Sequence, residues 1–234
     1  MRHDPRRVAL LLVVCALLGC ARPRPAPPTA AAPPWTVAAS SGIPNLDLVK
    51  GDIKEYRSSG RWEADIARVA EECAAAARDA HAQGRRPAAV FDIDETLLSN
   101  WPYEMEHDFA RIASLFRDWA ERSACPAIEP VKRFYVALHD AGIACFVITG
   151  RRETLRDATI RNLERQGISG WTGISFRPND DRDTSVIPFK SGERARIESK
   201  GFTIITNIGD QDSDLAGGHA LHTCKLPNPM YFIP

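Results

Sequence analysis

The stretch Ala88–Asn100 reads Ala-Ala-Val-Phe-Asp-Ile-Asp-Glu-Thr-Leu-Leu-Ser-Asn and contains the end of a predicted central strand. Its apolar run stops at Asp92, and a second carboxylate follows at Asp94. Because side chains alternate along a strand, Asp92 and Asp94 lie on one face while Ile93 points the other way. Neighbouring carboxylates repel each other and lose hydration on burial. A strand that enters a polar turn is the simpler interpretation, but the pair favours a cation or a bound proton beside it.

Apolar strands and amphipathic helices alternate along the chain around this stretch. The predicted helices span residues 60–83, 131–141, 152–166 and 189–200, and the predicted strands span residues 88–92, 143–148, 173–176, 202–208 and 220–224. Strands that alternate with helices form a parallel sheet with right-handed crossovers. We therefore expect an α/β fold with a three-layer, Rossmann-like parallel sheet.

Residues 99–128 interrupt this alternation. The segment predicts a loop at Asn100–Tyr103 and then an amphipathic helix around Phe109–Trp119, where apolar residues recur at spacings of three and four. We expect a small helical cap insertion after the first strand, lying over the ends of the strands.

Polar residues follow three of the predicted strands, namely Asp92 and Asp94, Thr149, and Asp210 and Asp214. Ligands bind such sheets at the carboxyl ends of the strands, so the topology should gather these residues at one edge. Oxygen ligands without histidine favour Mg²⁺, and a threonine at a helix start suits phosphate oxygens. Carboxylates, a metal, a hydroxyl and a nearby lysine together predict a phosphoryl-transfer site.

These motifs resemble those of the haloacid dehalogenase (HAD) superfamily. The nearest branch is the acid phosphatase branch, subfamily IIIB, which includes plant acid phosphatases, vegetative storage proteins and bacterial surface lipoprotein acid phosphatases. The resemblance rests on Asp92–Tyr103 (Asp-Ile-Asp-Glu-Thr-Leu-Leu-Ser-Asn-Trp-Pro-Tyr), Phe189–Arg194 (Phe-Lys-Ser-Gly-Glu-Arg) and Ile208–Leu215 (Ile-Gly-Asp-Gln-Asp-Ser-Asp-Leu). It covers the chain from about residue 45 to the C-terminus.

The resemblance implies a phosphoric monoester hydrolase that passes through an aspartyl-phosphate intermediate. Asp92 is then the nucleophile, and Asp94 protonates the leaving oxygen and later deprotonates water. Mg²⁺ is held by Asp92, the carbonyl of Asp94 and Asp210. Asp214 acts on the metal through water or orients Lys190. In this scheme Asp92 stays ionised and Asp94 carries the proton.

The resemblance also implies a phosphate-binding set. Thr149 binds a phosphoryl oxygen, Gly150 allows close approach, and Lys190 binds phosphate and neutralises Asp92. Lys200 is the rival for the lysine role, but Phe-Lys-Ser at Lys190 fits the branch better. Arg151 contacts the substrate or covers a helix start.

Aromatic residues of the expected cap have two interpretations. One interpretation is that they stack on an aromatic or nucleoside leaving group, and the other is that they pack in the core and loops of the protein. The residues concerned are Trp101, Tyr103 and also Tyr231. The sequence does not decide between these two roles, nor does it name the natural substrate beyond a small-molecule phosphate monoester.

The N-terminus has the pattern of a signal peptide over residues 1–19, with arginines before a short apolar run. Leu17-Leu18-Gly19-Cys20 resembles a bacterial lipobox, which makes Cys20 the lipidated first residue of the mature protein. Residues 21–44 form a Pro/Ala-rich tether, and residues 45–234 form the HAD-like domain. We expect export and anchoring to the outer membrane, facing the periplasm or cell surface, with plain secretion or a short membrane anchor as the alternatives.

The remaining composition leaves several questions open. The formal net charge of zero does not suggest a nucleic-acid partner. Four cysteines (Cys73, Cys125, Cys145 and Cys224) allow three pairings, none of which is favoured, and Cys145 is expected to be a buried thiol. The oligomeric state is not indicated. Alternative functions are a phosphotransferase with the same intermediate and a non-enzymatic surface or storage lipoprotein.

Overall fold

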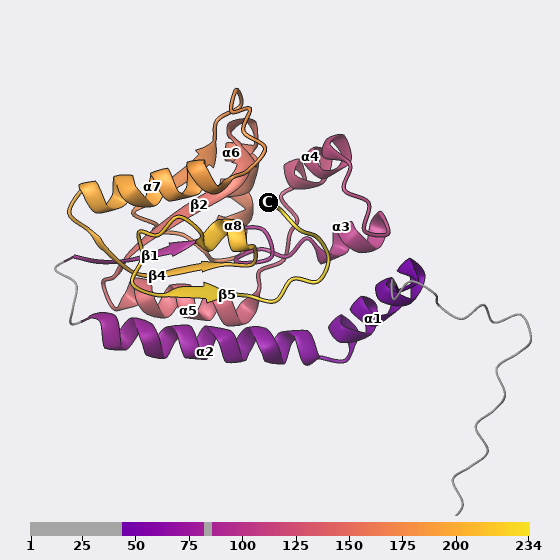
Figure 1. Ribbon diagram of the computed structural model, residues 1–234, viewed down its shortest axis with the longest axis horizontal. Coiled ribbons are helices and arrows are strands. Elements are labelled where there is room, and N and C mark those ends of the chain that lie inside the picture. Colours follow the sequence, from indigo (N-terminus) through magenta and orange to yellow (C-terminus); the bar gives the residue numbers. More distant parts are fainter. Residues whose placement is uncertain (1–43, 82–85) are drawn as a thin grey trace, which may run out of the picture. The chain divides into compact units, whose positions relative to one another are not determined.

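Five parallel strands form one sheet at the centre of the protein, in the order β3-β2-β1-β4-β5 (Figure 1). They are β1 (Pro87–Phe91), β2 (Ala144–Arg152), β3 (Gly173–Arg177), β4 (Thr203–Gly209) and β5 (Thr223–Lys225). The computed structural model describes residues 44–81 and 86–234, and the unit discussed below is Asn45–Pro234. The predicted signal peptide, Cys20 and the tether up to residue 43 lie outside the described residues.

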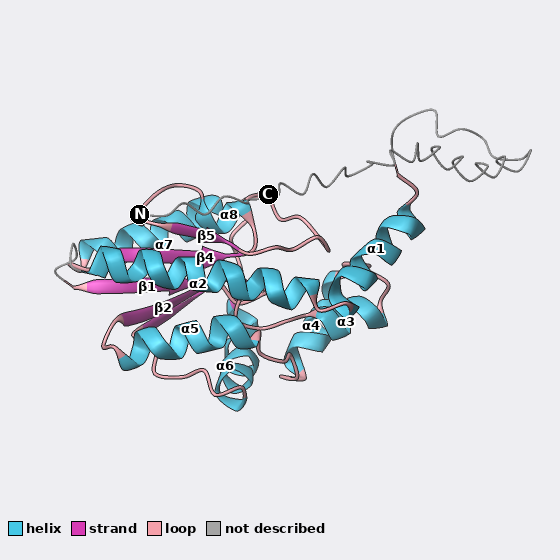
Figure 2. Cartoon of the chain, turned by 90° about the horizontal axis from the view of Figure 1, so that it is seen from below, coloured by secondary structure: helices cyan, strands magenta, loops and turns pink. Residues whose placement is uncertain are grey.

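Helices cover both faces of the sheet (Figures 1 and 2). On one face lie α2 (Arg61–His81) and α5 (Glu129–Asp140), and on the other lies α7 (Ile187–Ser199). The other helices are α1 (Leu46–Ser58), α3 (Trp101–Glu106), α4 (Ala113–Glu121), the 3₁₀ turn η1 (Glu153–Leu155), α6 (Arg156–Arg165) and α8 (Asp212–Leu215). The three-layer parallel α/β fold predicted from the sequence is therefore confirmed. Within the described ranges, no helix combines the length and apolar character needed to cross a membrane.

The strand β1 is apolar on both faces because helices pack against both. Phe91 packs its ring 5.9 Å from that of Phe134 and 5.3 Å from that of Tyr135, both on α5. Val90 belongs instead to the core cluster that includes Ile197 of α7. Alternation then turns Asp92, two residues after Val90, towards the α7 side of the sheet. The packing of β1 thus fixes the direction in which the first carboxylate points.

The strand register brings the predicted polar residues to one edge. Phe91 of β1 lies opposite Val147 of β2 and opposite Ile208 of β4. Asp92 follows one residue after Phe91, and Asp210 follows two residues after Ile208. Parallel pairing therefore places these side chains at the same carboxyl edge of the sheet, as the fold class requires.

The cap is helical, but its first helix lies where a loop was predicted. Asn100–Tyr103 was expected to be a loop, whereas α3 starts at Trp101. Pro102 suits this helix start because it lies in the first turn, where its missing N–H has no intrahelical acceptor to lose. The helix α1 was also not predicted, although Leu46, Val49, Ile53 and Tyr56 recur at helical spacing; none of its residues is buried.

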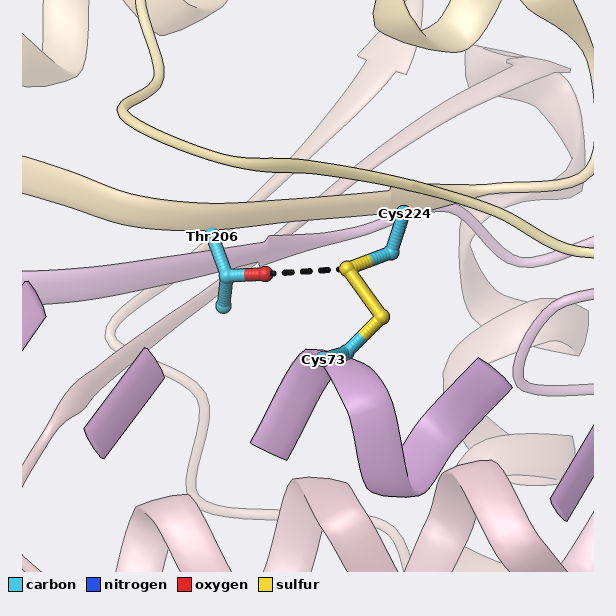
Figure 3. The surroundings of a disulfide bond; sticks show 3 residues. All are labelled: Cys73, Thr206 and Cys224. Carbon is cyan, nitrogen blue, oxygen red and sulfur yellow. Dashed lines mark hydrogen bonds between the residues drawn. A yellow bond between two sulfur atoms is a disulfide. The ribbon is translucent and has the colours of Figure 1, made fainter. Parts of the chain in front are cut away.

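A disulfide joins α2 to β5 between Cys73 and Cys224, which are 151 residues apart in sequence (Figure 3). The hydroxyl of Thr206 lies 3.5 Å from the Cys224 sulfur and donates to it. In the described part of the chain, Cys125 and Cys145 are free buried thiols, which confirms the prediction for Cys145. The sequence could not choose this pairing because the contact between α2 and β5 exists only in the folded chain.

We predict that the double substitution Cys73→Ala/Cys224→Ala lowers the free energy of unfolding by about 2–5 kcal/mol, because the disulfide restricts a very long loop in the unfolded chain. Urea denaturation followed by circular dichroism measures this difference. A reductant serves as the control, since it should destabilise the native protein and leave the double variant unchanged. Equal unfolding midpoints for the native protein and the variant would contradict the prediction.

Candidate active site

A cavity of about 200 Å³ opens at the carboxyl edge of the sheet. The loops after β1 and β4 and the end of β2 contribute to its lining, together with α7, α8, the cap and the C-terminal segment (residues 223–234). Its lining residues are Asp92, Asp94, Arg111, Phe116, Gly150, Arg151, Arg177, Val186, Lys190, Asp210, Gln211, Asp214, Tyr231 and Ile233. Most of the polar residues predicted from the sequence are therefore brought to one cavity.

Three buried carboxylates meet at the base of this cavity. One oxygen each from Asp92, Asp210 and Asp214 lies within 4.8 Å of the others. The ammonium of Lys190 lies 2.6 Å from Oδ1 of Asp92 and 2.5 Å from Oδ1 of Asp214. When all four groups are ionised, three negative charges face one positive charge. The cluster therefore lacks two positive charges.

This charge imbalance affects the ionisation of the carboxylates. Burial raises the pKa of Asp92, the charge of Lys190 opposes this, and the charge of Asp214 adds to the increase. Burial also raises the pKa of Asp210, again with help from the charges of Asp214 and Asp92. A divalent cation would supply the two missing charges and favour the ionised carboxylates. Three buried carboxylates provide the oxygen donors that Mg²⁺ prefers, so these residues fit such an ion.

The C-terminal segment orients Asp210. Asn228 Nδ2 donates to Oδ2 of Asp210 at 2.7 Å, and Gln211 Nε2 donates to the same oxygen at 2.5 Å. Lys225 Nζ donates to the backbone carbonyl of Asp210 at 2.6 Å. Asn228 and Lys225 were not identified from the sequence, because nothing in their local pattern shows that the chain returns to β4 after β5.

A glycine allows Asp214 to approach β4. A Cβ atom at Gly209 would lie 2.4 Å from the Cβ of Asp214, which is closer than side chains can come. Oδ2 of Asp214 accepts a hydrogen bond from the backbone N–H of Gln211 at 2.9 Å. Arg194 Nη1 donates to the carbonyl of Asp214 at 2.6 Å. The Gly-Asp-Gln-Asp-Ser-Asp motif is thus a tight turn that presents two carboxylates to the same point.

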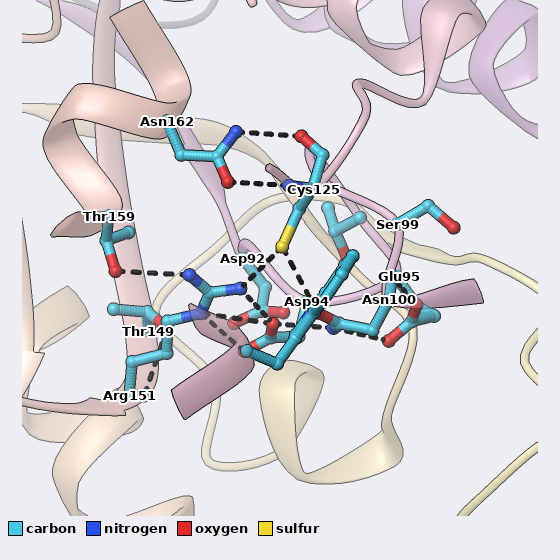
Figure 4. Close-up of polar contacts among 12 residues, drawn as sticks. Asp92, Asp94, Glu95, Ser99, Asn100, Cys125, Thr149, Arg151, Thr159 and Asn162 are labelled. Atoms are coloured by element: carbon cyan, nitrogen blue, oxygen red, sulfur yellow. Dashed lines mark hydrogen bonds and ion pairs between the residues drawn. The ribbon is translucent and has the colours of Figure 1, made fainter. Parts of the chain in front are cut away.

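Asp94 lies beside this cluster but its carboxylate belongs to a separate ion pair (Figure 4). Arg151 donates to it from Nη2 at 2.7 Å and from Nε at 3.1 Å, and Asn100 Nδ2 donates at 2.7 Å. Arg151 is itself buried and also donates to Thr159 Oγ1 at 3.1 Å. Its guanidinium is therefore held in one position, with Asp94 as its charge partner.

The two carboxylates that flank Ile93 have pKa shifts in opposite directions. Burial acts to raise the pKa of Asp94, but the charge and hydrogen bonds of Arg151, with the hydrogen bond from Asn100, outweigh burial and lower it. The pKa of Asp92 is raised, chiefly by burial. The contact of Asp94 with Arg151 was not predicted, because the sequence suggested Arg151 only as a substrate contact or helix cover.

The residues at the end of β2 differ in their access to the cavity. Gly150 lines it, whereas Thr149 is fully buried and is absent from the lining. The hydroxyl of Thr149 accepts a hydrogen bond from the backbone N–H of Arg151 at 3.1 Å. A Cβ at Gly150 would meet only Val186, at an ordinary distance of 3.8 Å, so packing within the protein does not require a glycine there.

The expected aromatic partners of a leaving group are placed elsewhere. Tyr103 is fully buried, and its hydroxyl donates to the carbonyl of Ala110 at 2.8 Å. Trp101 packs edge-on against Phe109, with ring centroids 6.2 Å apart. Neither Trp101 nor Tyr103 lines the cavity, so the structure favours packing for both. The aromatic residues that do line it are Phe116 of α4 and Tyr231 of the C-terminal segment.

The two candidate lysines are also clearly distinguished. Lys190 is buried between two carboxylates, whereas Lys200 is an exposed residue after the end of α7.

Tyr231 connects the C-terminal segment to the loop after β1, because its hydroxyl donates to the buried carboxylate of Glu95. Glu95 adopts a positive φ of 52° and accepts the backbone N–H of Asn100 at 2.5 Å, so this loop is fixed from within.

Comparison with known proteins agrees with this fold. Residues 29–234 match the HAD superfamily, subfamily IIIB (Acid phosphatase), and the chain belongs to that family. It is accordingly a phosphoric monoester hydrolase of the acid phosphatase type.

Relatives cover most of the chain. Acid phosphatase 1 of Solanum lycopersicum is 35% identical over 188 residues, covering 77% of this chain and 73% of that protein. Vegetative storage protein 1 of Arabidopsis thaliana is 29% identical over 205 residues, covering 83% and 76% of the two chains. The solved structure of the class C acid phosphatase from Bacillus anthracis has a TM-score of 0.66 at 23% identity, covering 80% of this chain and 87% of that one, and supports the fold.

Proposed function

We propose that this protein is a Mg²⁺-dependent acid phosphatase that hydrolyses phosphate monoesters through a phosphoryl group carried on Asp92. The observation that carries the proposal is the charge of the buried cluster, in which Asp92, Asp210 and Asp214 face the single ammonium of Lys190. Such a cluster is costly to bury unless it serves to bind a cation and a phosphoryl group. Mg²⁺, when bound, would offset the negative charge of the carboxylates and the phosphoryl oxygens.

The reaction proceeds by two displacements. Asp92 has one oxygen beside Lys190, and its other oxygen attacks phosphorus while the bond to the leaving oxygen breaks. Asp94 first takes up a proton from solvent and then donates it to that oxygen, and the alcohol departs. Water then attacks the phosphorus atom of the phosphorylated Asp92, and Asp94 accepts a proton from the water. The bond between phosphorus and the Asp92 oxygen breaks, which releases phosphate and regenerates Asp92. The ion pair with Arg151 stabilises ionised Asp94 and therefore favours the second displacement, in which a base is needed.

Binding of the phosphoryl oxygens falls to neighbouring groups in this proposal. Lys190 contacts a phosphoryl oxygen as well as Asp92, and the backbone at Gly150 approaches the group without a side chain in the way. Thr149 contributes from behind Gly150, where its hydroxyl already accepts the N–H of Arg151. Asp210 and Asp214 would complete the oxygen ligands of Mg²⁺, either directly or through water.

We predict that Asp92→Asn reduces release of phosphate from p-nitrophenyl phosphate by about a thousand-fold or more, because an amide does not replace the carboxylate nucleophile. Removal of Mg²⁺ by a chelator should abolish the activity of the native protein, and added Mg²⁺ should restore it. The matched control is Asp140→Asn, which makes the same chemical change at an exposed residue at the end of α5 and should retain full activity. If the native protein with Mg²⁺ releases no more phosphate than Asp92→Asn does, the enzymatic proposal fails.

We further propose that residues 45–234 are exported and tethered by residues 21–44 to a lipid on Cys20. The pattern before Cys20 supports this, and a disulfide between Cys73 and Cys224 suits an oxidising compartment. We predict that cells fed a radiolabelled fatty acid label the native protein and do not label Cys20→Ser. Equal labelling of both, or release of the native protein in unlabelled form, would contradict lipid attachment.

A further inference from the structure

A second cavity of about 390 Å³ adjoins the first. Arg111, Phe116, Gly150 and Arg151 line both cavities, so the two meet around the ring of Phe116 and the backbone at Gly150. When the phosphoryl group of a substrate lies at Asp92 in the first cavity, the leaving group can therefore extend into the larger second cavity.

The second cavity is basic and partly apolar. Its lining contains four arginines, Arg111, Arg117, Arg151 and Arg152, and no aspartate or glutamate from the described residues. Apolar surface comes from residues of α4 and of the segment just before it, together with Leu155 of η1. The first cavity differs, because four aspartates contribute to its lining.

The four arginines are not equally available to a ligand. Arg151 is bound to Asp94, and Arg111 lies 3.4 Å from the buried carboxylate of Glu104. Arg117 is 57% exposed and lies 3.1 Å from Asp118 and 3.9 Å from Glu121, both on its own helix.

Arg152 uses one nitrogen to donate to the carbonyl of Pro178 at 2.6 Å, and within the described ranges it has no carboxylate within 4.0 Å. The nearby Asp181 is engaged by Arg177 at 2.7 Å. Arg152 therefore offers the positive charge most available to a ligand in this cavity. Arg117, whose carboxylate partners are exposed on the surface of α4, offers a second.

We infer that this second cavity binds the leaving group of the substrate and selects phosphate monoesters whose leaving group combines an apolar ring with a second anionic group. The inference rests on the proposed phosphatase activity. Guanidinium groups bind carboxylates and phosphates through paired hydrogen bonds, and the ring of Phe116 provides a surface for an apolar body. With the phosphoryl group held in the first cavity, the substrate is oriented with its second anion at Arg117 and Arg152.

The test compares three substrates of the full chain with Mg²⁺. The substrates are 4-carboxyphenyl phosphate, its neutral counterpart 4-carbamoylphenyl phosphate, and 4-(phosphonomethyl)phenyl phosphate, which carries a second phosphorus anion that cannot be hydrolysed. We expect kcat/KM to be about five-fold higher for at least one anionic substrate than for the neutral one, a size typical of partly exposed ion pairs. The two anionic substrates show whether the cavity prefers a carboxylate or a phosphate-like group.

Arginine variants test whether the second cavity causes the preference for anionic substrates. In Arg117→Gln/Arg152→Gln the ratio of kcat/KM between anionic and neutral substrates should fall to about one, whereas Arg133→Gln, an exposed arginine on α5, should leave the ratio unchanged. Equal kcat/KM for all three substrates overturns this inference and leaves the phosphatase proposal intact. A preference that persists in the double variant also overturns it. Failure to hydrolyse any of the three substrates overturns both proposals.

Discussion

Mutual repulsion among Asp92, Asp210 and Asp214 is the constraint around which the site is built. Their oxygens lie within 4.8 Å of one another, and all three residues are buried. Lys190 neutralises one charge and leaves two uncompensated. A protein that placed such groups together without function would be less stable for it, because buried charges are costly unless they are fully paired. A bound divalent cation would supply the two missing positive charges.

The fold supplies each part of this cluster from a different element. The two-sided packing of β1 turns Asp92 towards α7, and α7 carries Lys190. Gly209 lets Asp214 approach the end of β4. The C-terminal segment, whose start is linked to α2 by the disulfide, returns to hold Asp210 through Asn228. The site is therefore assembled from strand ends and then secured by chain that is distant in sequence.

Much of this could be predicted from the sequence because its signals are local. The alternation of strands and helices predicts the parallel sheet, and Asp92 and Asp210 each directly follow an apolar strand. Other features depend on contacts across the fold. The pairing of Asp94 with Arg151 joins residues 57 apart, and that of Asn228 with Asp210 depends on how the tail returns. Tyr103 lies in a motif of the family, yet only packing shows that it is buried.

Calorimetric titration of Mg²⁺ into the protein in the absence of substrate tests the central claim, that the three carboxylates form a divalent cation site. The account predicts one ion per chain, with binding lost in Asp210→Asn. Binding should be retained in Asp212→Asn, which changes an exposed aspartate two residues away in the same motif. Absence of Mg²⁺ binding to the native protein, or equal binding by Asp210→Asn, would contradict the account.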